Sequence, residues 1–318
     1  MPSNSRSKTI GVIVMTYGSA TTAEHVAEYM KHIYKDSIPE GLIEDFAERY
    51  RLVGHSPLVD ITRQQASALE ERLKLSTNSN SVRYVVQTGM LHSKPFIDDA
   101  VAACHKAGAE QLIGIILSPQ FSSFIMEGYR SALKTAAAKH GFTEKRLTIV
   151  GPWPTEPHFI ELLAIRVTDV LAKLRTIYGT TIPVVFTTHS LPERVVANDP
   201  TYLDQLKATA DAVVAKLHSP KLQWYAAYQS AGHTPEAWLK PDLVDILAKL
   251  RDQHQPAVLI VPIQFLADHL EILYDLDIAG SEQCQEYGIA YNRIELPNTA
   301  PLFIRALAAL VDHIKIYT

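Results

Sequence analysis

The stretch "PVVFTTHSLPERV", residues 183–195, decides the fold, because it joins a short apolar run to a polar segment. The run "PVVF" has the length and the branched apolar residues of a buried strand. His189 follows at the point where such a strand would end. A histidine at a strand end is more often a hydrogen-bonded structural residue than a functional one, so its role depends on the rest of the chain.

Seven other runs rich in Val and Ile recur between longer amphipathic stretches: "TIGVIVM", "VRYVVQ", "QLIGIIL", "LTIV", "LQWYAAY", "AVLIV" and "IAYNRI". Among the amphipathic stretches are "FIDDAVAACHKAG", residues 96–108, and "LVDILAKLRDQ", residues 243–253, which opens after a predicted N-cap at Asp242. Strands that alternate with helices favour parallel sheets covered on both faces. We therefore predict an α/β protein of two Rossmann-like domains, each with a four-stranded parallel sheet flanked by helices.

The predicted domain boundary is the proline-rich stretch "GPWPTEP", residues 151–157, which neither a helix nor a central strand can continue. We expect an N-terminal domain over residues 1–155 and a C-terminal domain over residues 156–318. A last predicted helix, residues 301–316, can pack on either half, including the N-terminal one. Neither half carries a glycine-rich phosphate-binding motif, which argues against a nucleotide ligand.

Composition excludes several classes of protein. The net charge of -4, from 34 acidic and 30 basic residues, gives no basic surface for nucleic acid. Two isolated cysteines, Cys104 and Cys284, cannot form a four-cysteine iron–sulfur site and fit a reducing compartment. The N-terminal run "TIGVIVM" imitates a signal peptide but is short for one and makes a good strand. No apolar run approaches the roughly 20 residues of a membrane span, so we expect a soluble, cytoplasmic protein.

Chemically reactive residues follow four of the predicted strands. In open parallel sheets ligands bind outside the carboxyl ends of the strands. Tyr17 follows the first strand, in "MTYGS", and His189 takes the equivalent place in the second half. The third strand of each half leads to a segment with Tyr129 and to a helix start with Glu271, respectively. If the halves face each other, we expect an imidazole, a carboxylate and phenols in one cleft.

Glu271 and Asp275 are four residues apart and would share one face of an α-helix. They can form a solvated face or a track for a cation, and imidazole with carboxylate suits Fe(II), Mn(II) or Zn(II). His269 is expected on a different face and is interpreted as structural. The apolar stripe of this helix is predicted at Leu270, Leu273 and Tyr274.

Three long motifs resemble those of the ferrochelatase family. "TTHSLPERV" resembles its S-A-H-S-L-P motif, and "YQSAGHTPEAWLKPD" resembles its W-Q-S-x-G-x-T-P-x-P-W-L-x-P-D loop. "VPIQFLADHLEILYDLD" resembles its P-x-G-F-x-x-D-H-L-E-x-L-Y-D helix entry. The likeness continues through "MTYGS", "RYRLVGHSPL" and "SPQFSSF", and is strongest to the coproporphyrin ferrochelatases of Gram-positive bacteria.

The resemblance implies a ferrochelatase, an enzyme of the lyase class that inserts Fe(II) into coproporphyrin III to give coproheme in heme biosynthesis. It implies two domains around a porphyrin cleft, in a monomeric, cytoplasmic protein without stable membrane insertion. Fe(II) would be a substrate, with no organic cofactor and no iron–sulfur cluster. The expected partners are coproporphyrin III, coproheme and, transiently, the next enzyme of the pathway, with no nucleic acid.

Position by position, the resemblance implies that His189 and Glu271 are the catalytic and metal-binding pair. Tyr17 would ligate iron from the other face of the macrocycle, and Asp275 would extend the metal track. Two positions depart from the family: Tyr34 replaces a common arginine after "HI", and Ala279 interrupts the acidic line. The expected porphyrin-contacting residues are Tyr17, Tyr34, Arg49, Tyr50, Ser56 and Tyr129.

The expected chemistry is proton removal coupled to metal entry. A neutral imidazole, with a reference pKa of about 6.5, can accept pyrrole protons. His189 would take them, while Glu271 supports the metal and passes protons outward past Asp275. Three alternatives stay open: a chelatase acting on protoporphyrin IX, one acting on a sirohydrochlorin-like tetrapyrrole, and a non-catalytic heme-binding protein with Tyr17 as axial ligand.

Overall fold

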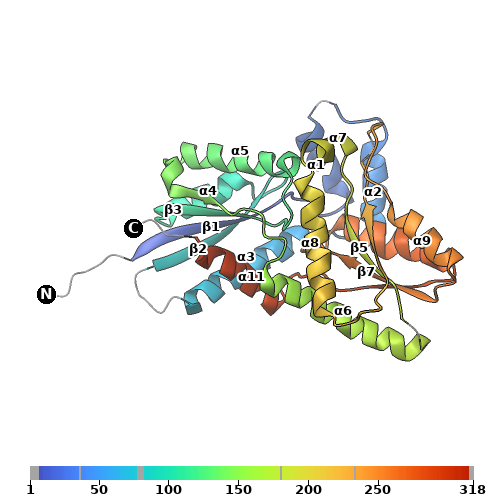
Figure 1. The fold of residues 1–318 in the computed structure, drawn as a ribbon. Helices are drawn as coiled ribbons and strands as arrows, with labels where there is room; N and C mark the ends of the chain where they lie inside the picture. Colours follow the sequence, from blue (N-terminus) through green and yellow to red (C-terminus); the bar gives the residue numbers. More distant parts are fainter. Residues whose placement is uncertain (1–6, 36, 77–81, 180, 233, 315–318) are drawn as a thin grey trace. The chain divides into compact units, whose positions relative to one another are not determined.

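The computed structural model describes residues 7–35, 37–76, 82–179, 181–232 and 234–314 (Figure 1). The chain divides into two compact units. The first comprises the chain up to Ser118, Ser123–Pro152 and the part from Asn298 onward, and the second comprises Pro119–Ser122 and Trp153–Pro297. Each unit holds one sheet.

The sheet of the first unit has the strand order β2-β1-β3-β4, and all of its neighbouring strands are parallel. In the centre of the sheet, Ile13 of β1 pairs with Gln87 of β2 and with Gly114 of β3. β1 is apolar and buried along almost its whole length, as expected for a central parallel strand. The strands are β1 (Lys8–Thr16), β2 (Val82–Met90), β3 (Gln111–Ile116) and β4 (Leu147–Ile149).

Helices cover both faces of this sheet. Figure 1 shows α4 (Ile97–Lys106) and α5 (Ser123–Lys139) on one face, with α3 (Leu58–Ser76) and α11 (Pro301–Asp312) on the other. α4 approaches β1 so closely that a Cβ at Gly11 would lie 2.8 Å from the Sγ of Cys104. The other helical segments are η1 (Ala23–His25), α1 (Val26–Tyr34), α2 (Leu42–Val53) and η2 (Glu144–Arg146).

The second unit repeats this plan with the strand order β6-β5-β7-β8, again all parallel. Val185 of the central strand pairs with Tyr225 of β6 and with Ile260 of β7. β5 therefore occupies the place that β1 has in the first unit. The strands are β5 (Val184–His189), β6 (Trp224–Gln229), β7 (Ala257–Pro262) and β8 (Ala290–Arg293).

One face of the second sheet packs against α9 (Leu243–Asp252), η3 (Ile272–Gly280) and α10 (Ser281–Glu286), whose apolar residues share a buried cluster with Val185 and Ile260. α9 begins where the sequence predicts, because the Asp242 carboxylate accepts a hydrogen bond from the Val244 N–H at 3.1 Å. The remaining helices of this unit are α6 (Pro157–Tyr178), α7 (Glu193–Asn198) and α8 (Thr201–Lys216).

The predicted fold class is confirmed, since all eight predicted strands occur and form two four-stranded parallel sheets. One of the crossings from the first unit to the second lies between Pro152 and Trp153, inside the proline-rich stretch. α11 packs against α3, and both belong to the first unit.

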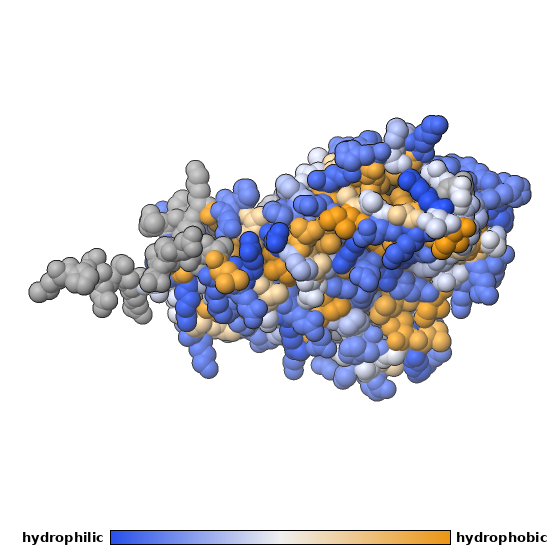
Figure 2. Space-filling view, turned by 90° about the horizontal axis from the view of Figure 1, so that it is seen from below, coloured by the Kyte–Doolittle hydropathy of each residue, from blue (hydrophilic) through white to orange (hydrophobic). Residues whose placement is uncertain are grey.

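Hydrophilic residues dominate the face of the molecule in Figure 2, with hydrophobic residues gathered in smaller areas between them. Within the described residues, no helix is both long enough and apolar enough to pass through a bilayer. Scattered exposed hydrophobic side chains are ordinary for a folded domain. The most exposed ones are Leu75, Ile177, Leu52 and Phe124.

Candidate active site

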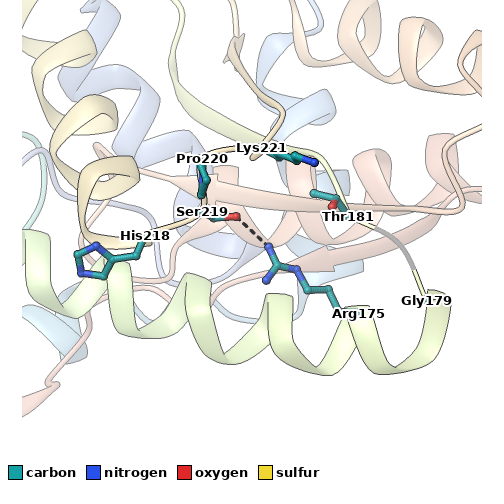
Figure 3. A pocket seen from close by; sticks show the side chains of 7 residues that line it. All are labelled: Arg175, Gly179, Thr181, His218, Ser219, Pro220 and Lys221. Carbon is teal, nitrogen blue, oxygen red and sulfur yellow. Dashed lines mark hydrogen bonds between the residues drawn. The ribbon is translucent and has the colours of Figure 1, made fainter.

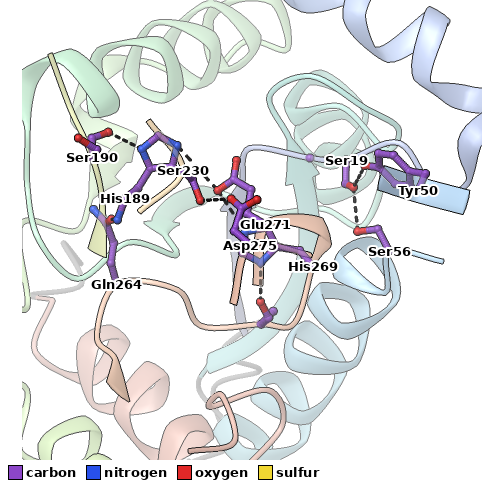
Figure 4. A network of polar contacts seen from close by, with 12 residues as sticks. Ser19, Tyr50, Ser56, His189, Ser190, Ser230, Gln264, His269, Glu271 and Asp275 are labelled. Atoms are coloured by element: carbon purple, nitrogen blue, oxygen red, sulfur yellow. Dashed lines mark hydrogen bonds and ion pairs between the residues drawn. The ribbon is translucent and has the colours of Figure 1, made fainter. Parts of the chain in front are cut away.

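His189 is the last residue of β5, at the carboxyl edge of the second sheet. Its Nδ1 is hydrogen-bonded to the backbone carbonyl oxygen of Ser190 (Figure 4). A carbonyl oxygen can only accept, so Nδ1 carries the proton of the neutral ring. Nε2 then has a free lone pair, which can accept a proton or bind a metal.

Glu271 lies in the first turn of the helix that follows β7, as the sequence predicts. Its Oε2 is 3.8 Å from Nε2 of His189 and 3.6 Å from Nε2 of His269. The Nδ1 of His269 is 3.0 Å from the carbonyl oxygen of Ala267, which gives this ring the same tautomer as His189. Two imidazole lone pairs therefore face one carboxylate oxygen.

The interpretation of His269 as a residue on another helix face was wrong. His269 directly precedes the first helical residue, Leu270, and its carbonyl accepts a hydrogen bond from the Leu273 N–H at 3.0 Å. From this position at the helix start its ring reaches Glu271. Its ring also packs on Phe265, with centroids 4.6 Å apart. The interpretation of His269 as a structural residue stays a prediction, but its proximity to Glu271 was not expected from the sequence.

These donor separations are compatible with a shared cation, because two ligands each about 2.0–2.2 Å from one ion can be up to about 4.4 Å apart. Over the described ranges, however, no three His, Cys, Asp or Glu side chains form a ready-made ion site. The site therefore offers pairs of N and O donors rather than a closed cage. An open arrangement of this kind suits a metal that passes through.

Asp275 lies in the first turn of η3, which is a π-helix rather than the predicted α-helix. Its carboxylate accepts a hydrogen bond from the hydroxyl of Ser230, the first residue after β6. Ser230 has a left-handed backbone, with φ of 57°, which is uncommon for a residue other than glycine. π-Helical turns are rare and concentrate at functional sites.

The predicted apolar stripe of this helix was right at Leu270, which is buried, and wrong at Leu273 and Tyr274, which are only partly buried. Ile272 and Leu276 are fully buried in their place. The reason is the wider π-helical turn, with hydrogen bonds from residue i to i+5, which changes the residues that face the sheet. A pattern based on α-helical spacing cannot predict this change.

An ion pair fixes the π-helix to the sheet. Arg293, at the end of β8, donates to both carboxylate oxygens of Asp277, at 2.7 and 2.6 Å. It also lies 3.6 Å from Asp268, beside His269. Burial would lower the pKa of Arg293, but the hydrogen bonds to Asp277 outweigh it and raise the pKa above its usual value. Arg293 thus connects the segments before and after Glu271 to the end of β8.

Tyr17 is the first residue after β1 and is 43% exposed. Its ring lies against His92, with centroids 4.4 Å apart, and Nδ1 of His92 is 3.0 Å from Nδ1 of His32. Burial, and next the charge of His32, lower the pKa of His92 to about 4. His92 is therefore neutral near pH 7, and the end of β1 is aromatic where the end of β5 is polar.

The predicted porphyrin contacts of the first unit are spread over three helices and a loop. Tyr50 and Ser56 are both buried and converge on Ser19, whose Oγ lies 2.8 and 2.9 Å from their hydroxyl oxygens (Figure 4). Arg49 of α2 lies over the ring of Phe46. Tyr34 ends α1, and Tyr129 is buried in α5, where burial raises its pKa.

A shallow depression of about 520 Å³ lies at the opposite, amino-terminal edge of the second sheet (Figure 3). Arg175 donates there to the Ser219 hydroxyl at 3.1 Å. Ligands of parallel sheets bind at the carboxyl edge, so this depression is not part of the candidate site. It is lined by Arg175, Gly179, Thr181, His218, Ser219, Pro220 and Lys221.

The family model of the ferrochelatases matches residues 9–314. The chain belongs to the ferrochelatase family. Its relatives include a protein named coproporphyrin III ferrochelatase from Anoxybacillus flavithermus, 37% identical, with 97% of each chain covered. Another of that name, from Listeria monocytogenes, is 35% identical over 96% of this chain and 97% of its own.

Solved structures share the fold of this ferrochelatase-family chain. SirB from Bacillus subtilis, solved with Fe3+, matches with a TM-score of 0.57 and 14% identity, over 96% of this chain and 94% of its own. CbiX, described as the terminal enzyme of siroheme biosynthesis in denitrifying bacteria, matches with a TM-score of 0.53 and 11% identity, over 97% of this chain and all of its own. At these identities the likeness is one of fold alone.

Proposed function

We propose that this protein inserts Fe(II) into coproporphyrin III to form coproheme, as a step of heme biosynthesis. The observation that carries the proposal is the convergence of two imidazole Nε2 atoms on the Glu271 carboxylate. It occurs in a ferrochelatase-family chain whose relatives from Anoxybacillus flavithermus and Listeria monocytogenes bear the name coproporphyrin III ferrochelatase.

In the proposed reaction, two pyrrole N–H protons leave the macrocycle as one Fe(II) enters. His189 accepts these protons at Nε2, because its Nδ1 proton is held by the Ser190 carbonyl. Glu271 supports the incoming iron and receives the proton from the imidazole, with His269 on its other side. Asp275, which accepts from Ser230, is the next acceptor along the π-helix.

The first unit is proposed to bind the porphyrin. Coproporphyrin III carries four carboxylates, which require cationic and hydroxyl partners. Arg49, Tyr34 and Tyr129 are proposed among these partners. The hydroxyls of Tyr50 and Ser56 hold Ser19 and so shape the segment that follows Tyr17. Tyr17 itself is proposed as an iron ligand through its phenol oxygen. The domain limits proposed from sequence, 1–155 and 156–318, assign these residues to the N-terminal domain.

The proposed setting is the cytoplasm, with the protein acting as a monomer and passing coproheme on through a transient contact. No organic cofactor and no iron–sulfur cluster enters the proposal. Cys104 and Cys284 belong to different units, and burial raises the pKa of each thiol to about 12. Thiols of this kind are packing residues rather than metal ligands.

An anaerobic assay with Fe(II) and either coproporphyrin III or protoporphyrin IX tests the proposal. We expect faster turnover of coproporphyrin III, followed by the absorbance of the product. Glu271→Gln should lower the rate by about 100-fold or more, as for loss of a general acid–base group. Glu295→Gln, at an exposed position of the same unit, is the matched control.

Two outcomes would overturn the proposal. Preferred turnover of protoporphyrin IX would mean that the porphyrin is wrong. Tight binding of coproheme without insertion of Fe(II) would instead indicate a heme-binding protein.

A further inference from the structure

The backbone N–H of His189 donates a hydrogen bond to a side chain, at a position where a parallel strand would normally supply a backbone carbonyl. β5 and β7 pair up to Thr187 and Pro262, and the last backbone bond of this ladder runs from the Ile263 N–H to the Thr187 carbonyl, at 3.0 Å. In a parallel ladder the next bond would join the His189 N–H to the Ile263 carbonyl. Instead, the His189 N–H donates to Oε1 of Gln264 at 2.9 Å.

The carbonyl left over at this edge also has a side-chain partner. Nε2 of Gln120 donates to the Ile263 carbonyl at 3.1 Å and to the Thr209 hydroxyl at 3.0 Å. Two glutamine side chains therefore satisfy the donor and the acceptor of the one absent backbone bond. Only one of the two, Gln264, touches His189.

Gln264 is itself fixed at both ends of its amide. Its Nε2 donates to the hydroxyl of Tyr202 at 2.7 Å. Gln264 is 6% exposed and Tyr202 is fully buried, so neither hydrogen bond competes with solvent. A buried amide that lost one of these partners would leave an unpaired polar group, which favours the single arrangement seen here.

We propose that Gln264 is a positioning residue for His189, held in turn by Tyr202. The inference rests on the proposed function, because it assigns the network to the placement of the proton-accepting imidazole. The next residue, Phe265, packs edge-on against that imidazole with centroids 6.3 Å apart, so one turn of chain holds both the backbone and the ring of His189.

Three substitutions test the network by steady-state insertion of Fe(II) into coproporphyrin III. Gln264→Leu supplies an apolar side chain of comparable bulk, one atom shorter, and removes both hydrogen bonds. It should lower kcat by about 10- to 100-fold, the effect of a small displacement of a reacting group. The KM for the porphyrin should change less than about threefold, because Gln264 does not contact the substrate in this proposal.

Gln264→Glu keeps an acceptor for the His189 N–H and allows the Tyr202 hydroxyl to donate to it. It should restore most of kcat. Tyr202→Phe leaves Oε1 in place and removes only the outer anchor, so it should lower kcat by less than about tenfold, as for one neutral hydrogen bond. If Gln264→Leu does not fold, the nuclear magnetic resonance signal of the His189 amide proton in Tyr202→Phe decides instead, and a signal identical to that of the wild type would overturn the positioning role.

Gln120→Leu is the matched control, because it removes an equally buried amide from the same edge without touching His189. It should lower thermal stability with kcat per folded molecule unchanged. The chemical shift and exchange rate of the His189 amide proton give a readout independent of activity, and both should move in Gln264→Leu and not in Gln120→Leu.

The failures of the two proposals are distinguishable. If the wild-type protein inserts no iron, the proposed function fails, whatever the amide signal does. If it inserts iron and Gln264→Leu matches Gln120→Leu in kcat and in the His189 amide signal, the positioning role is overturned.

Discussion

The two sheets of this protein have the same backbone plan and different chemistry at the same place. Each has a central strand flanked by the strands that follow it in the same order, β2-β1-β3-β4 in one and β6-β5-β7-β8 in the other. At the carboxyl end of the central strand, one unit places Tyr17 against an imidazole pair, and the other places His189 against a carboxylate. The shared frame therefore fixes where the reactive residue lies, and the segments after the strands fix what it can do.

The difference extends to the supporting residues. Around Tyr17 the contacts described above are those of an imidazole pair, whereas His189 has, besides the ring of Phe265, a carbonyl and an amide that fix its tautomer and its backbone N–H. Ring packing tolerates small displacements better than directional hydrogen bonds do. We therefore expect substitutions at the end of β5 to affect catalysis more than those at the end of β1.

The largest expected effect is that of His189→Ala. Loss of the proton acceptor should lower the rate of iron insertion by about 10²- to 10⁴-fold, the usual range for general base catalysis. His218→Ala, in the depression at the opposite edge of the same sheet, should leave the rate within about twofold, because no reacting group is near it. Steady-state insertion with Fe(II) measures both. Near wild-type insertion by His189→Ala would remove the histidine from the mechanism.

The cores of the two sheets should respond differently to alanine. Ile260 of β7 and Gly114 of β3 occupy equivalent places, beside Val185 and Ile13 of the central strands. Ile260→Ala leaves a cavity and should lower the free energy of unfolding by about 2–5 kcal/mol. Gly114→Ala overlaps Leu133 and should cost about 1–3 kcal/mol.

Denaturant unfolding of both variants, followed by circular dichroism, measures these costs. Val244→Ala, at an exposed position, is the control and should change the free energy of unfolding by less than about 0.5 kcal/mol. A harmless Gly114→Ala would mean that α5 can move away from β3, and the close packing described above would have no energetic meaning.

A smaller effect concerns pH and the first unit only. The pKa of His92 is about 4 in the folded protein, below the unfolded value of about 6.5. The unfolded chain therefore binds more protons between these values, and the free energy of unfolding should fall as pH falls from about 6.5 to 4. In His92→Phe, the decrease in the free energy of unfolding over this pH range should be smaller than in the wild type by about 1–2 kcal/mol, a figure that allows for partial exposure of the ring.

Urea unfolding at a series of pH values measures this dependence, and the matched control is His105→Phe, at an exposed position of the same unit. The free energy of unfolding of the two variants should depend on pH with different slopes below about pH 6.5 and with the same slope above it. Parallel curves for wild type and His92→Phe would show that burial and the charge of His32 do not depress the pKa of His92.

The sequence predicted the frame of this molecule better than its site. Runs such as "TIGVIVM" and "AVLIV" have the length and composition of buried parallel strands, and each became one. The placement of Tyr17 and His189 at equivalent strand ends followed from the same pattern. These features depend on local composition, which one sequence contains.

The misses share a different cause. The π-helix, the approach of His269 to Glu271, and the bond from the His189 N–H to Gln264 all depend on how the chain leaves a strand. Such turns depend on packing and on long-range hydrogen bonds, and these leave no periodic pattern in the sequence from which they could be predicted.

The smallest expected effect, and the one that sharpens the comparison most, is that of Tyr17→Phe. The substitution removes the phenol oxygen and keeps the ring that packs on His92. It should lower the rate of iron insertion by about 2- to 10-fold, as for loss of one neutral hydrogen bond or weak ligand. Tyr29→Phe, which removes a hydroxyl bonded to the Gly18 carbonyl near the same strand end, is the control and should change the rate less. If Tyr17→Phe instead cost more than His189→Ala, the metal would enter on the side of the phenol, and the polar end of β5 would serve the departing protons alone.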